Sequence, residues 1–499
     1  MAHLPFGASC SPCRPLHVAN LVAAPRPANA AALPVKLCHL EQLQPPVVAS
    51  GFHTDAFDTA QAFVVGLLFG VGAARLRRKC GSRVTQRLRA ARGAVVGDTV
   101  RAADSLAEWL RARGTIISDA ICVVSEDPVV GSRGCVATRA VEQGELLMEL
   151  PLACCFAAAP GVDDALGPLV DRLDTAGINV KDAALAVAFA EEKSLGENSP
   201  WWPYVACVGE AEMTFPFFFN SDDLDALQSP SLAASLSEKV EALRAVAAHK
   251  SLDEKSFLAA YQLVLGRRFG TGDERYMLPH GDLLNHSFTP TCKFEDPQKG
   301  ANPMWRLIAL RRISPGEALN FEYCQDSNHL LLATSGFVVG GNPFNRIMAR
   351  PADLRRGLRA VCNAGSPDDF ARFRSEEFEK QLPDPEEESM SMYLVGKKNG
   401  LIQWNPLWLN LCGLAVTMSP TGPHWSQLAG GTAAYCAAVE DATWTALFDT
   451  TLEQDASKLE GGGLTENGRL ALRFRMGQKE LLKEALDTMK AKMISSAAA

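Results

Sequence analysis

Two short segments near the middle of the chain combine residue types that can bind a ligand or take part in catalysis. The pair Asn285–His286 follows an apolar run in P-H-G-D-L-L-N-H-S, and both side chains can form hydrogen bonds from a constrained turn. Tyr323 ends a second short segment, Phe321–Tyr323, and supplies a phenolic hydroxyl. Neither segment is specific alone, since an Asn-His pair usually marks an ordinary turn. Their meaning depends on the elements that position them.

Two strand–turn–strand units are predicted around these segments. Ala137–Leu147 (A-T-R-A-V-E-Q-G-E-L-L) and Ala309–Leu319 (A-L-R-R-I-S-P-G-E-A-L) share a local pattern and begin 172 residues apart. Each turn is centred on a glycine, Gly144 or Gly316, which suits a backbone with positive φ, and Pro315 preorganises the second turn. The match predicts one β-rich domain interrupted by an insertion, although two unrelated hairpins would give the same pattern.

The insertion is predicted to be helical. Ser229 and Pro230 suit the N-cap and first position of a helix, and the apolar residues that follow recur at spacings of three and four. These residues are Leu232, Leu236, Val240, Leu243 and Ala247. Upstream, Trp201–Tyr204 and Phe215–Phe219 supply aromatic bulk, which we expect to lie in the core or between domains.

A change of pattern after Asn345 predicts a separate, mainly helical domain over 346–499. The strand pattern stops there, and Leu382–Ser389 (LPDPEEES) is typical of an exposed loop. The last long segment places its apolar residues on one helical face. These residues are Leu470, Phe474, Leu481, Ala485, Met489 and Met493.

The order of motifs over roughly 120–345 resembles the SET-domain methyltransferases, in the branch that contains the Rubisco large-subunit lysine methyltransferase and the actin-histidine methyltransferase. The ordered motifs are N-H-S at Asn285, R-x-I-x-x-G-E-x-L at Arg311, x-x-Y at Tyr323, S-N-x-x-L-L at Ser327 and G-F at Gly336. Further marks of the branch are G-S-R-G-C-V-A from Gly131, S-P-W-W-P-Y from Ser199 and R-R-F from Arg267.

The resemblance implies a fold of the α+β class. A SET domain of short strands, with its β-clip and pseudoknot, is expected over 119–345 and holds the helical insertion at about 152–275. The helical domain over 346–499 matches the substrate-binding domain of the branch. Residues 1–118 are expected to be a targeting segment of low order.

The resemblance also implies a role for each matching residue, with S-adenosylmethionine as the cofactor. The implied cofactor-binding residues are Gly131, Ser132, Arg133, Arg267, Asn285, His286, Tyr323 and Phe337. Arg267 stands where the family places an arginine near the cofactor carboxylate, a charge-assisted pair. Tyr323 occupies the position of the catalytic tyrosine, and Phe337 that of an aromatic residue near the cofactor.

The chemistry of methyl transfer explains why residues of these types are sufficient for catalysis. The sulfonium of S-adenosylmethionine is already activated, so the protein has to hold a neutral nitrogen nucleophile in line with the methyl group. A tyrosine hydroxyl and backbone carbonyls can orient that nitrogen and accept weak CH···O contacts. An apolar channel lowers the pKa of a substrate lysine by desolvation. The resemblance implies no metal.

Two residues depart from the family pattern. Rubisco-methyltransferase-like members usually carry tyrosine two residues before the phenylalanine of Y-G-F, where this chain has Ser335, as in the S-G-F of the actin-histidine methyltransferase. Cys324 follows Tyr323, where members often have glycine. A serine at 335 widens the pocket and removes a hydroxyphenyl group. We expect lysine as the acceptor, with histidine as the rival within the class; the degree of methylation stays open.

Two alternatives come from other classes. The chain could be a non-catalytic SET-fold module that holds a protein partner, but Arg267, Asn285–His286 and Tyr323 occur together, which favours an enzyme. A metal-dependent hydrolase would need ligands such as His280, His286 and His329. Their spacing provides no HxxxH pair and no carboxylate suited to a three-ligand site.

Charge and cysteine usage restrict the partners. Residues 1–118 carry 14 basic and 6 acidic side chains, so residues 119–499 carry −16 of a total net charge of −8. An acidic body argues against nucleic acid and favours a basic protein substrate. Only Cys10–Cys13 forms a CxxC, without a second pair of ligands, and the other cysteines read as thiols of a reducing compartment. We expect a monomer.

The N-terminal segment predicts an organellar destination. No acidic residue precedes Glu41, and the stretch is rich in alanine and proline with scattered Arg14, Arg26 and Lys36, as in a transit peptide. The apolar run 62–74 is shorter than the roughly 20 residues that span a membrane, and eight basic residues follow within Arg75–Arg92. Membrane association through 62–92 is therefore not favoured, and a presequence is. Plastid is preferred to mitochondrion by analogy with the Rubisco enzyme.

Overall fold

The computed structural model describes residues 100–126, 133–208, 216–270, 274–297, 302–363, 392–416 and 431–498, all within one compact unit. The expectations for the CxxC, the transit segment, the apolar run 62–74 and the loop Leu382–Ser389 lie outside these residues. Residues 100–111 form the first described helix. Over the described ranges, no helix combines the length and apolar character needed to cross a membrane.

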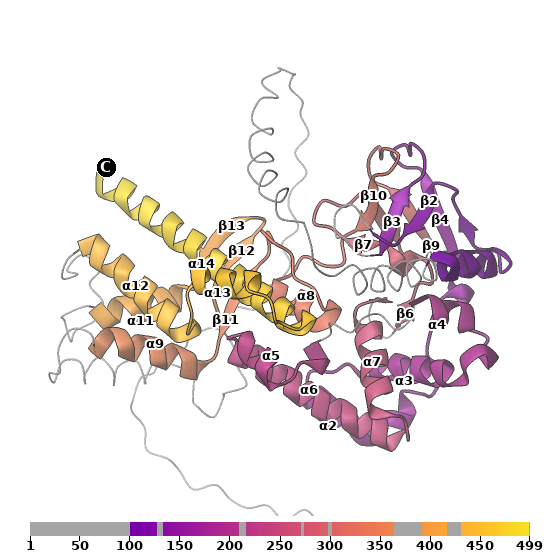
Figure 1. The fold of residues 1–499 in the computed structure, drawn as a ribbon, viewed down its shortest axis with the longest axis horizontal. Coiled ribbons are helices and arrows are strands. Elements are labelled where there is room, and N and C mark those ends of the chain that lie inside the picture. The colour runs from indigo at the N-terminus through magenta and orange to yellow at the C-terminus, as the bar shows by residue number, and fades with distance from the viewer. Residues whose placement is uncertain are drawn as a thin grey trace, which may run out of the picture. The chain divides into compact units, whose positions relative to one another are not determined.

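Short strands form two four-stranded sheets, with the orders β1-β4-β9-β8 and β2-β3-β10-β7 (Figure 1). The strands of the first sheet are β1 (Ile116–Ile117), β4 (Leu146–Pro151), β8 (Cys292–Glu295) and β9 (Met304–Ala309). Those of the second are β2 (Ile121–Val124), β3 (Gly134–Ala137), β7 (Asn285–His286) and β10 (Ala318–Phe321). Both sheets combine strands from before and after the insertion, as the paired strand–turn–strand units predict.

The two predicted turns are bonded to each other in matching ways. Gly144 and Gly316 both have φ of 79°, a left-handed conformation that favours glycine. The Gly144 N–H donates to the Ala309 carbonyl at 2.9 Å, and the Gly316 N–H donates to the Ala137 carbonyl at 2.7 Å. Because these partners hold equivalent places in the two units, the units form one structure and are not unrelated hairpins.

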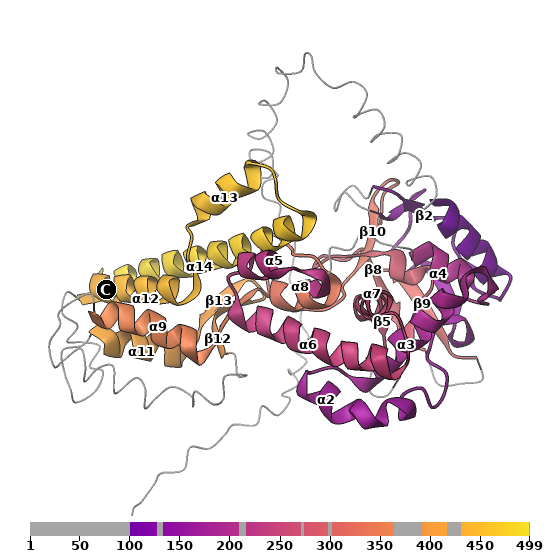
Figure 2. The ribbon, with the colours of Figure 1, turned by 60° about the horizontal axis from the view of Figure 1, so that its bottom comes forward.

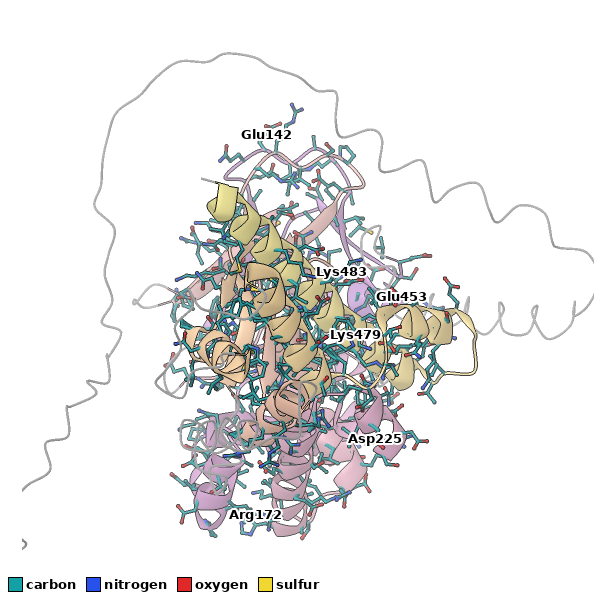
Figure 3. The ribbon with its side chains drawn as sticks, turned by 90° about the vertical axis from the view of Figure 1, so that its left-hand side faces the viewer. Glu142, Arg172, Asp225, Glu453, Lys479 and Lys483 are labelled. Atoms are coloured by element: carbon teal, nitrogen blue, oxygen red, sulfur yellow. The ribbon has the colours of Figure 1, made fainter. Side chains whose placement is uncertain are left out.

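Ion pairs also occur at equivalent positions in the two strand–turn–strand units. Arg139 pairs with Glu145 at 2.9 Å, and Arg311 pairs with Glu317 at 2.6 Å, each across its own turn. Glu142 lies in the first of these turns (Figure 3). All these side chains are at least partly exposed, so each pair contributes at most about 1 kcal/mol. The hydrogen bonds and the buried Val141 and Ile313, which face each other in a β-bridge, therefore hold the turns together.

A parallel pairing carries the Asn-His pair to the end of strand β10. Strand β7 lies beside β10, with Asn285 opposite Asn320 and His286 opposite Phe321. The other pairings of the two sheets are antiparallel. Since β10 runs on toward Tyr323, the register places the Asn-His pair beside the tyrosine that follows the strand.

Helices occupy most of the insertion. They are α2 (Val170–Thr175), α3 (Val180–Leu195), α4 (Trp202–Val208), α5 (Ser221–Ala226), α6 (Pro230–His249) and α7 (Glu254–Leu265), with 3-10 turns at Leu152–Cys154, Asp164–Leu169, Gly196–Asn198 and Pro216–Phe218. A hairpin of β5 (Arg268–Phe269) and β6 (Tyr276–Met277) and a 3-10 turn, Gly281–Leu283, lead into β7. Figure 2 shows α6 running alongside α2.

The predicted apolar face of α6 is confirmed. Leu232, Leu236, Leu243 and Ala247 are buried, and Val240 packs against the same core. The helix begins as predicted, with Pro230 at its first position, although the Ser229 side chain makes no capping hydrogen bond. The aromatic residues upstream also contribute to the core: Tyr204, Phe217 and Phe219 are buried and Trp201 and Trp202 are partly buried, while Phe215 lies outside the described residues.

The C-terminal region is mostly helical, but the expectation that strands end at Asn345 is wrong. Helix α8 (Asn328–Ser335) precedes this region, whose helices are α9 (Pro351–Asn363), α11 (Pro406–Val416), α12 (Gly431–Leu447), α13 (Leu452–Glu460) and α14 (Glu466–Ala498). A sheet of order β11-β12-β13 accompanies them, formed by β11 (Arg346–Ala349), β12 (Met392–Lys398) and β13 (Leu401–Trp404). These strands are short, and β12 ends in Gly-Lys-Lys, so no alternating apolar pattern was visible.

Helix α14 contributes to two hydrophobic cores. Leu470 and Phe474 pack in the core shared by the two sheets and the insertion. Further along, Leu481, Ala485 and Met489 pack in a second core with α9, α11 and α12. Met493 packs against that second core, so the predicted apolar face of this helix is confirmed.

Candidate active site

Asn285 connects strand β7 to the chain segment that precedes β3. Its Nδ2 donates a hydrogen bond to the carbonyl oxygen of Arg133 at 3.0 Å. Arg133 is the one residue of the predicted Gly131–Arg133 contact that the structure describes; Gly131 and Ser132 lie outside the described residues. The carboxamide thus links two segments that are 152 positions apart. Both belong to the predicted cofactor site.

His286 presents one ring nitrogen without a protein partner. Its Nδ1 accepts a hydrogen bond from the backbone N–H of Tyr323 at 3.1 Å. Burial lowers the pKa of His286 to about 4, so the ring is neutral at pH 7. With Nδ1 as acceptor, the proton resides on Nε2. Nε2 is buried and has no hydrogen-bond partner within the described part of the chain, which leaves a donor available to a ligand.

Tyr323 is held by its hydroxyl group as well as by its backbone. The hydroxyl donates to the carbonyl oxygen of Leu284 at 2.7 Å. Burial raises the pKa of Tyr323 to about 12, against the opposing charge of Arg267. The phenol therefore stays protonated and neutral across the physiological range. Its oxygen retains lone pairs that can accept a contact from a ligand.

Aromatic rings surround His286 and Tyr323. The centroid of the His286 ring lies 4.4 Å from Phe288, 5.2 Å from Tyr323 and 5.9 Å from Phe337. Tyr323 lies 6.2 Å from Phe337 and 4.7 Å from Phe321. The structure thus brings Phe337 to the Asn-His pair and the tyrosine, as the motif order predicts. Such contacts fix ring positions without hydrogen bonds.

Two arginines, Arg267 and Arg133, lie within electrostatic range of the Asp282 carboxylate. Arg267 Nη1 donates to the Asp282 carbonyl at 2.5 Å and lies 3.8 Å from the Asp282 carboxylate. Burial and the nearby charge of Arg267 together lower the pKa of Arg133, because the two guanidinium groups are close enough to repel each other. Tyr204 donates its hydroxyl to Asp282 Oδ2 at 2.5 Å. With two cations and one carboxylate, the cluster favours an additional anion.

The donors present fit S-adenosylmethionine. The excess positive charge of Arg133 and Arg267 suits the cofactor carboxylate. The unpartnered Nε2–H of His286 suits a hydrogen-bond acceptor such as an adenine nitrogen. The rings of Phe288 and Phe337 provide apolar surface. The predicted roles of these residues remain assignments from the family pattern.

Sequence reasoning missed two residues of this cluster. Asp282 stands in the same P-H-G-D-L-L-N-H run as the Asn-His pair, and a buried carboxylate three residues before that pair was a usable signal. Tyr204 was assigned to core packing, and it is fully buried. Its hydroxyl partner lies 78 residues away in the chain, a relation that spacing cannot reveal.

The three histidines considered as metal ligands do not form a metal site. Over the described ranges, no group of three His, Cys, Asp or Glu side chains could hold a metal ion. His280 is buried with its Nδ1 unpartnered within the same ranges. His329 lies on α8, with its ring 6.4 Å from Phe474. The hydrolase alternative therefore has no support from the geometry.

Comparisons with known proteins agree with this architecture. Residues 132–324 match the model of the SET domain. The chain is 22% identical over 413 residues to the chloroplastic [fructose-bisphosphate aldolase]-lysine N-methyltransferase of Arabidopsis thaliana, covering 76% of this chain and 80% of that protein. It is 23% identical over 433 residues to the human actin-histidine N-methyltransferase, covering 76% and 67%.

Solved structures share the fold. The SET domain of LSMT bound to methyllysine and S-adenosylhomocysteine superposes with a TM-score of 0.51 at 17% identity, covering 79% of this chain and 92% of that one. Rubisco LSMT bound to S-adenosylmethionine gives the same TM-score and coverage at 16% identity. Residues 132–324 of the chain therefore form a SET domain, and over 76% of its length the chain is similar to protein methyltransferases.

Proposed function

We propose that this protein methyltransferase transfers the methyl group of S-adenosylmethionine to lysine side chains of a protein substrate. The observation that carries the proposal is the environment of the Tyr323 hydroxyl. That hydroxyl is fixed by the Leu284 carbonyl at 2.7 Å and lies among aromatic rings beside the two arginines. A neutral phenol and a backbone carbonyl in an apolar pocket are the groups that can orient an amine for methyl transfer.

The cofactor is assigned to the cluster between β3, β7 and the end of α7. Arg133 and Arg267 would hold its carboxylate, since they exceed the single Asp282 carboxylate in charge. The His286 Nε2–H would donate to its base. S-adenosylmethionine supplies an activated methyl group when it is bound. The chain's own task is to hold the acceptor nitrogen in line with that group.

The aromatic wall next to Tyr323 favours lysine as the acceptor. Phe321 stacks with Phe269 at 5.5 Å and meets Phe294 edge-on at 5.0 Å, so hydrocarbon surface continues away from the tyrosine. Such a wall can bury the methylene chain of lysine. The same desolvation lowers the pKa of the lysine amine, which increases the neutral, nucleophilic fraction. The three phenylalanine side chains of this wall offer no hydrogen bond to orient an imidazole.

Each residue then has a defined task before and during transfer. The aromatic wall excludes water and favours the deprotonated amine. The Tyr323 hydroxyl, already donating to Leu284, offers its lone pairs to the amine or to the methyl hydrogens. The proton released from the ammonium leaves to solvent before transfer, since Tyr323, with a pKa of about 12, stays protonated throughout.

The test is methyl transfer from isotopically labelled S-adenosylmethionine into plastid and mitochondrial lysates by the full chain. Mass spectrometry of the labelled peptides then identifies the modified residue. We expect label on lysine with the wild-type chain and at least tenfold less with Tyr323→Phe. Label on histidine would contradict the lysine assignment, and absence of label from every lysate would favour a binding module.

Histidine is the second candidate because of Ser335. Its Oγ lies 3.2 Å from the Thr334 hydroxyl, so a small polar group stands where a tyrosine is usual in the lysine-specific relatives. A smaller residue enlarges the pocket and would admit an imidazole ring. The Ser335→Tyr variant separates the two candidates. Lysine methylation should survive the added ring with fewer methyl groups per lysine, whereas histidine methylation should be lost.

We also propose that the protein acts in plastids. The supports are the transit-like composition of residues 1–118 and a chloroplastic relative. The human actin-histidine relative provides no such support. Imaging of the full chain with a C-terminal fluorescent tag tests the proposal, and signal confined to the cytosol or mitochondria would contradict it.

A further inference from the structure

Two buried carboxamide side chains form hydrogen bonds with the backbone on either side of the segment that carries Phe337. Helix α8 ends at Ser335, and Gly336 follows in the left-handed conformation, with φ of 72°. We call residues 335–337 the S-G-F segment. Gln262 of α7 binds the backbone just before this segment, and Asn328 at the start of α8 binds the backbone just after it.

Gln262 binds the backbone on the N-terminal side of the S-G-F segment. Its side chain is fully buried, and Nε2 donates to the carbonyl of Thr334 at 2.9 Å and to that of Ala333 at 3.4 Å. These carbonyls belong to the last turn of α8, which has no further helical N–H groups to accept from. Gly266, the C-cap of α7, also lies close to this backbone, since an added Cβ would be 3.4 Å from the Thr334 carbonyl.

Asn328 binds the backbone on the C-terminal side of the segment. Its Nδ2 donates to the Val339 carbonyl at 2.9 Å, and its Oδ1 accepts from the Val339 N–H at 3.0 Å. The carboxamide thus satisfies both backbone groups of one residue, as a neighbouring β-strand would. Asn342 donates to the same Oδ1 at 3.1 Å, which fixes the orientation of the carboxamide. Asn328 itself is 3% exposed.

The position of the segment matters because Phe337 contacts both chemical groups of the site. Its ring lies 5.9 Å from His286 and 6.2 Å from Tyr323. Only four residues, 335–338, separate Thr334 from Val339, the two residues whose backbone groups are held. Loss of either grip would let the Phe337 ring withdraw from its neighbours, and weak ring contacts alone would not hold it.

We propose that Gln262 and Asn328 are positioning residues that fix Phe337 against His286 and Tyr323 and thereby set the affinity for the cofactor. The inference rests on the proposed function, since it assumes that this pocket binds S-adenosylmethionine. Neither residue touches the three rings in the contacts described above. Both act through the backbone of the S-G-F segment.

The experiment measures the dissociation constant of S-adenosylhomocysteine by calorimetry with the full chain. Gln262→Met keeps the length of the side chain and removes its donor; Asn328→Ala removes both hydrogen bonds to Val339. We expect each variant to bind about tenfold more weakly, the equivalent of one lost buried hydrogen bond transmitted to the pocket. Gln262→Met should fold well, because it also removes the buried Oε1, which has no partner within the described residues.

Asn405→Ala is the matched control. Asn405 also binds the backbone twice, to the Tyr393 carbonyl at 2.8 Å and from the Leu407 N–H at 2.9 Å, but it is partly buried and lies between β13 and α11. It should lose a similar amount of unfolding free energy and keep the affinity of the wild type within twofold. A purely structural role would make all three variants alike.

The outcomes separate the two proposals. If the wild-type chain fails to bind S-adenosylhomocysteine, the proposed function fails. If the wild type binds and either folded variant binds within twofold of it, the positioning role is overturned. Should Asn328→Ala not fold, Gln262→Met alone decides.

Discussion

The backbone N–H of Tyr323 donates a hydrogen bond to Nδ1 of His286 at 3.1 Å. This contact joins the two segments that carry the chemistry, which are 37 residues apart in the chain. It lies just beyond the parallel register of β7 and β10, whose last pair is His286 opposite Phe321. It also sets the tautomer, because an accepting Nδ1 leaves the proton on Nε2. One backbone bond therefore positions the tyrosine and prepares the histidine donor.

Tyr323→Phe tests the role of the hydroxyl. The variant loses the hydrogen bond to the Leu284 carbonyl but keeps the ring contacts and the backbone bond to His286. We expect turnover to fall about 100-fold, as when an oriented polar group is removed from a reacting centre, with the S-adenosylhomocysteine affinity within threefold. Steady-state kinetics and calorimetry measure the two quantities. Undiminished turnover would reduce Tyr323 to a packing residue.

Asn285→Ala tests the link between β7 and the segment before β3. The variant removes the hydrogen bond to the Arg133 carbonyl, so Arg133 is no longer fixed beside the cofactor pocket. We expect S-adenosylhomocysteine binding to weaken by at least tenfold, since one buried hydrogen bond corresponds to about that factor. The control is Asn320→Ala. Asn320 lies in strand β10, and its carboxamide oxygen accepts a hydrogen bond from the Thr291 N–H. Full affinity in Asn285→Ala would contradict the site assignment.

The sequence predicted the parts of the fold that depend on local pattern. Gly144 and Gly316 lie at their turns because both need positive φ. The apolar spacing in α6 and α14 corresponds to faces that are buried. The sheet of β11, β12 and β13 was missed because β11 and β13 have only four residues each and β12 runs from apolar residues into Gly-Lys-Lys, without an alternating pattern. Long-range pairing, rather than local preference, selects them.

The candidate site was predicted through motif order rather than through contacts. Its motifs identified Asn285, His286 and Tyr323, and the structure brings these residues together. The Tyr204–Asp282 hydrogen bond and the grips of Gln262 and Asn328 were not visible. The contacts of Tyr204 and Gln262 depend on the packing of separate elements, and that of Asn328 depends on how the chain turns back after α8. The periodicity of a single sequence does not reveal such contacts.

His280 is expected to make the stability depend on pH. It is buried, and burial with the charge of Arg111 lowers its pKa to about 4, below the ordinary value of 6.5. The unfolded chain therefore takes up a proton between pH 6.5 and 4 that the folded chain does not. Its contribution is fully present above pH 6.5 and is lost as the pH falls toward 4. The slope is at most about 1.4 kcal/mol per pH unit.

The variant His280→Asn isolates this contribution. His280 has φ of 70°, and asparagine tolerates that conformation better than most residues. Urea unfolding at pH 7.5 and pH 5 gives the free energy of unfolding of both chains. We expect the free energy of unfolding to decrease less between these pH values in the variant. Part of the decrease should remain, because burial also lowers the pKa values of His286 and His329 to about 4. An equal decrease would show that His280 titrates normally.

A buried charge cluster joins α13 and α14. Arg475 and Lys479 both bind the Asp455 carboxylate, at 2.5 and 2.6 Å, and the three side chains are at most 4% exposed. Lys479 lies beside α13 near Glu453 in Figure 3. Arg475 also donates to the Ala226 carbonyl of α5 at 3.0 Å. Burial alone would raise the pKa of Asp455, but the hydrogen bonds from Arg475 and Lys479 hold it below its ordinary value.

Asp455→Asn should destabilise the chain strongly. The variant keeps the shape of the side chain but leaves two buried cations without an anion, which costs about 3–5 kcal/mol. Lys479→Met should cost less, because Arg475 and Asp455 then form a neutral pair. The exposed pair of Lys490 and Glu440, at 2.7 Å, gives the control: Glu440→Gln should cost at most about 1 kcal/mol. Chemical denaturation measures all three, and equal losses for Asp455→Asn and Glu440→Gln would show that the buried cluster is not ionised.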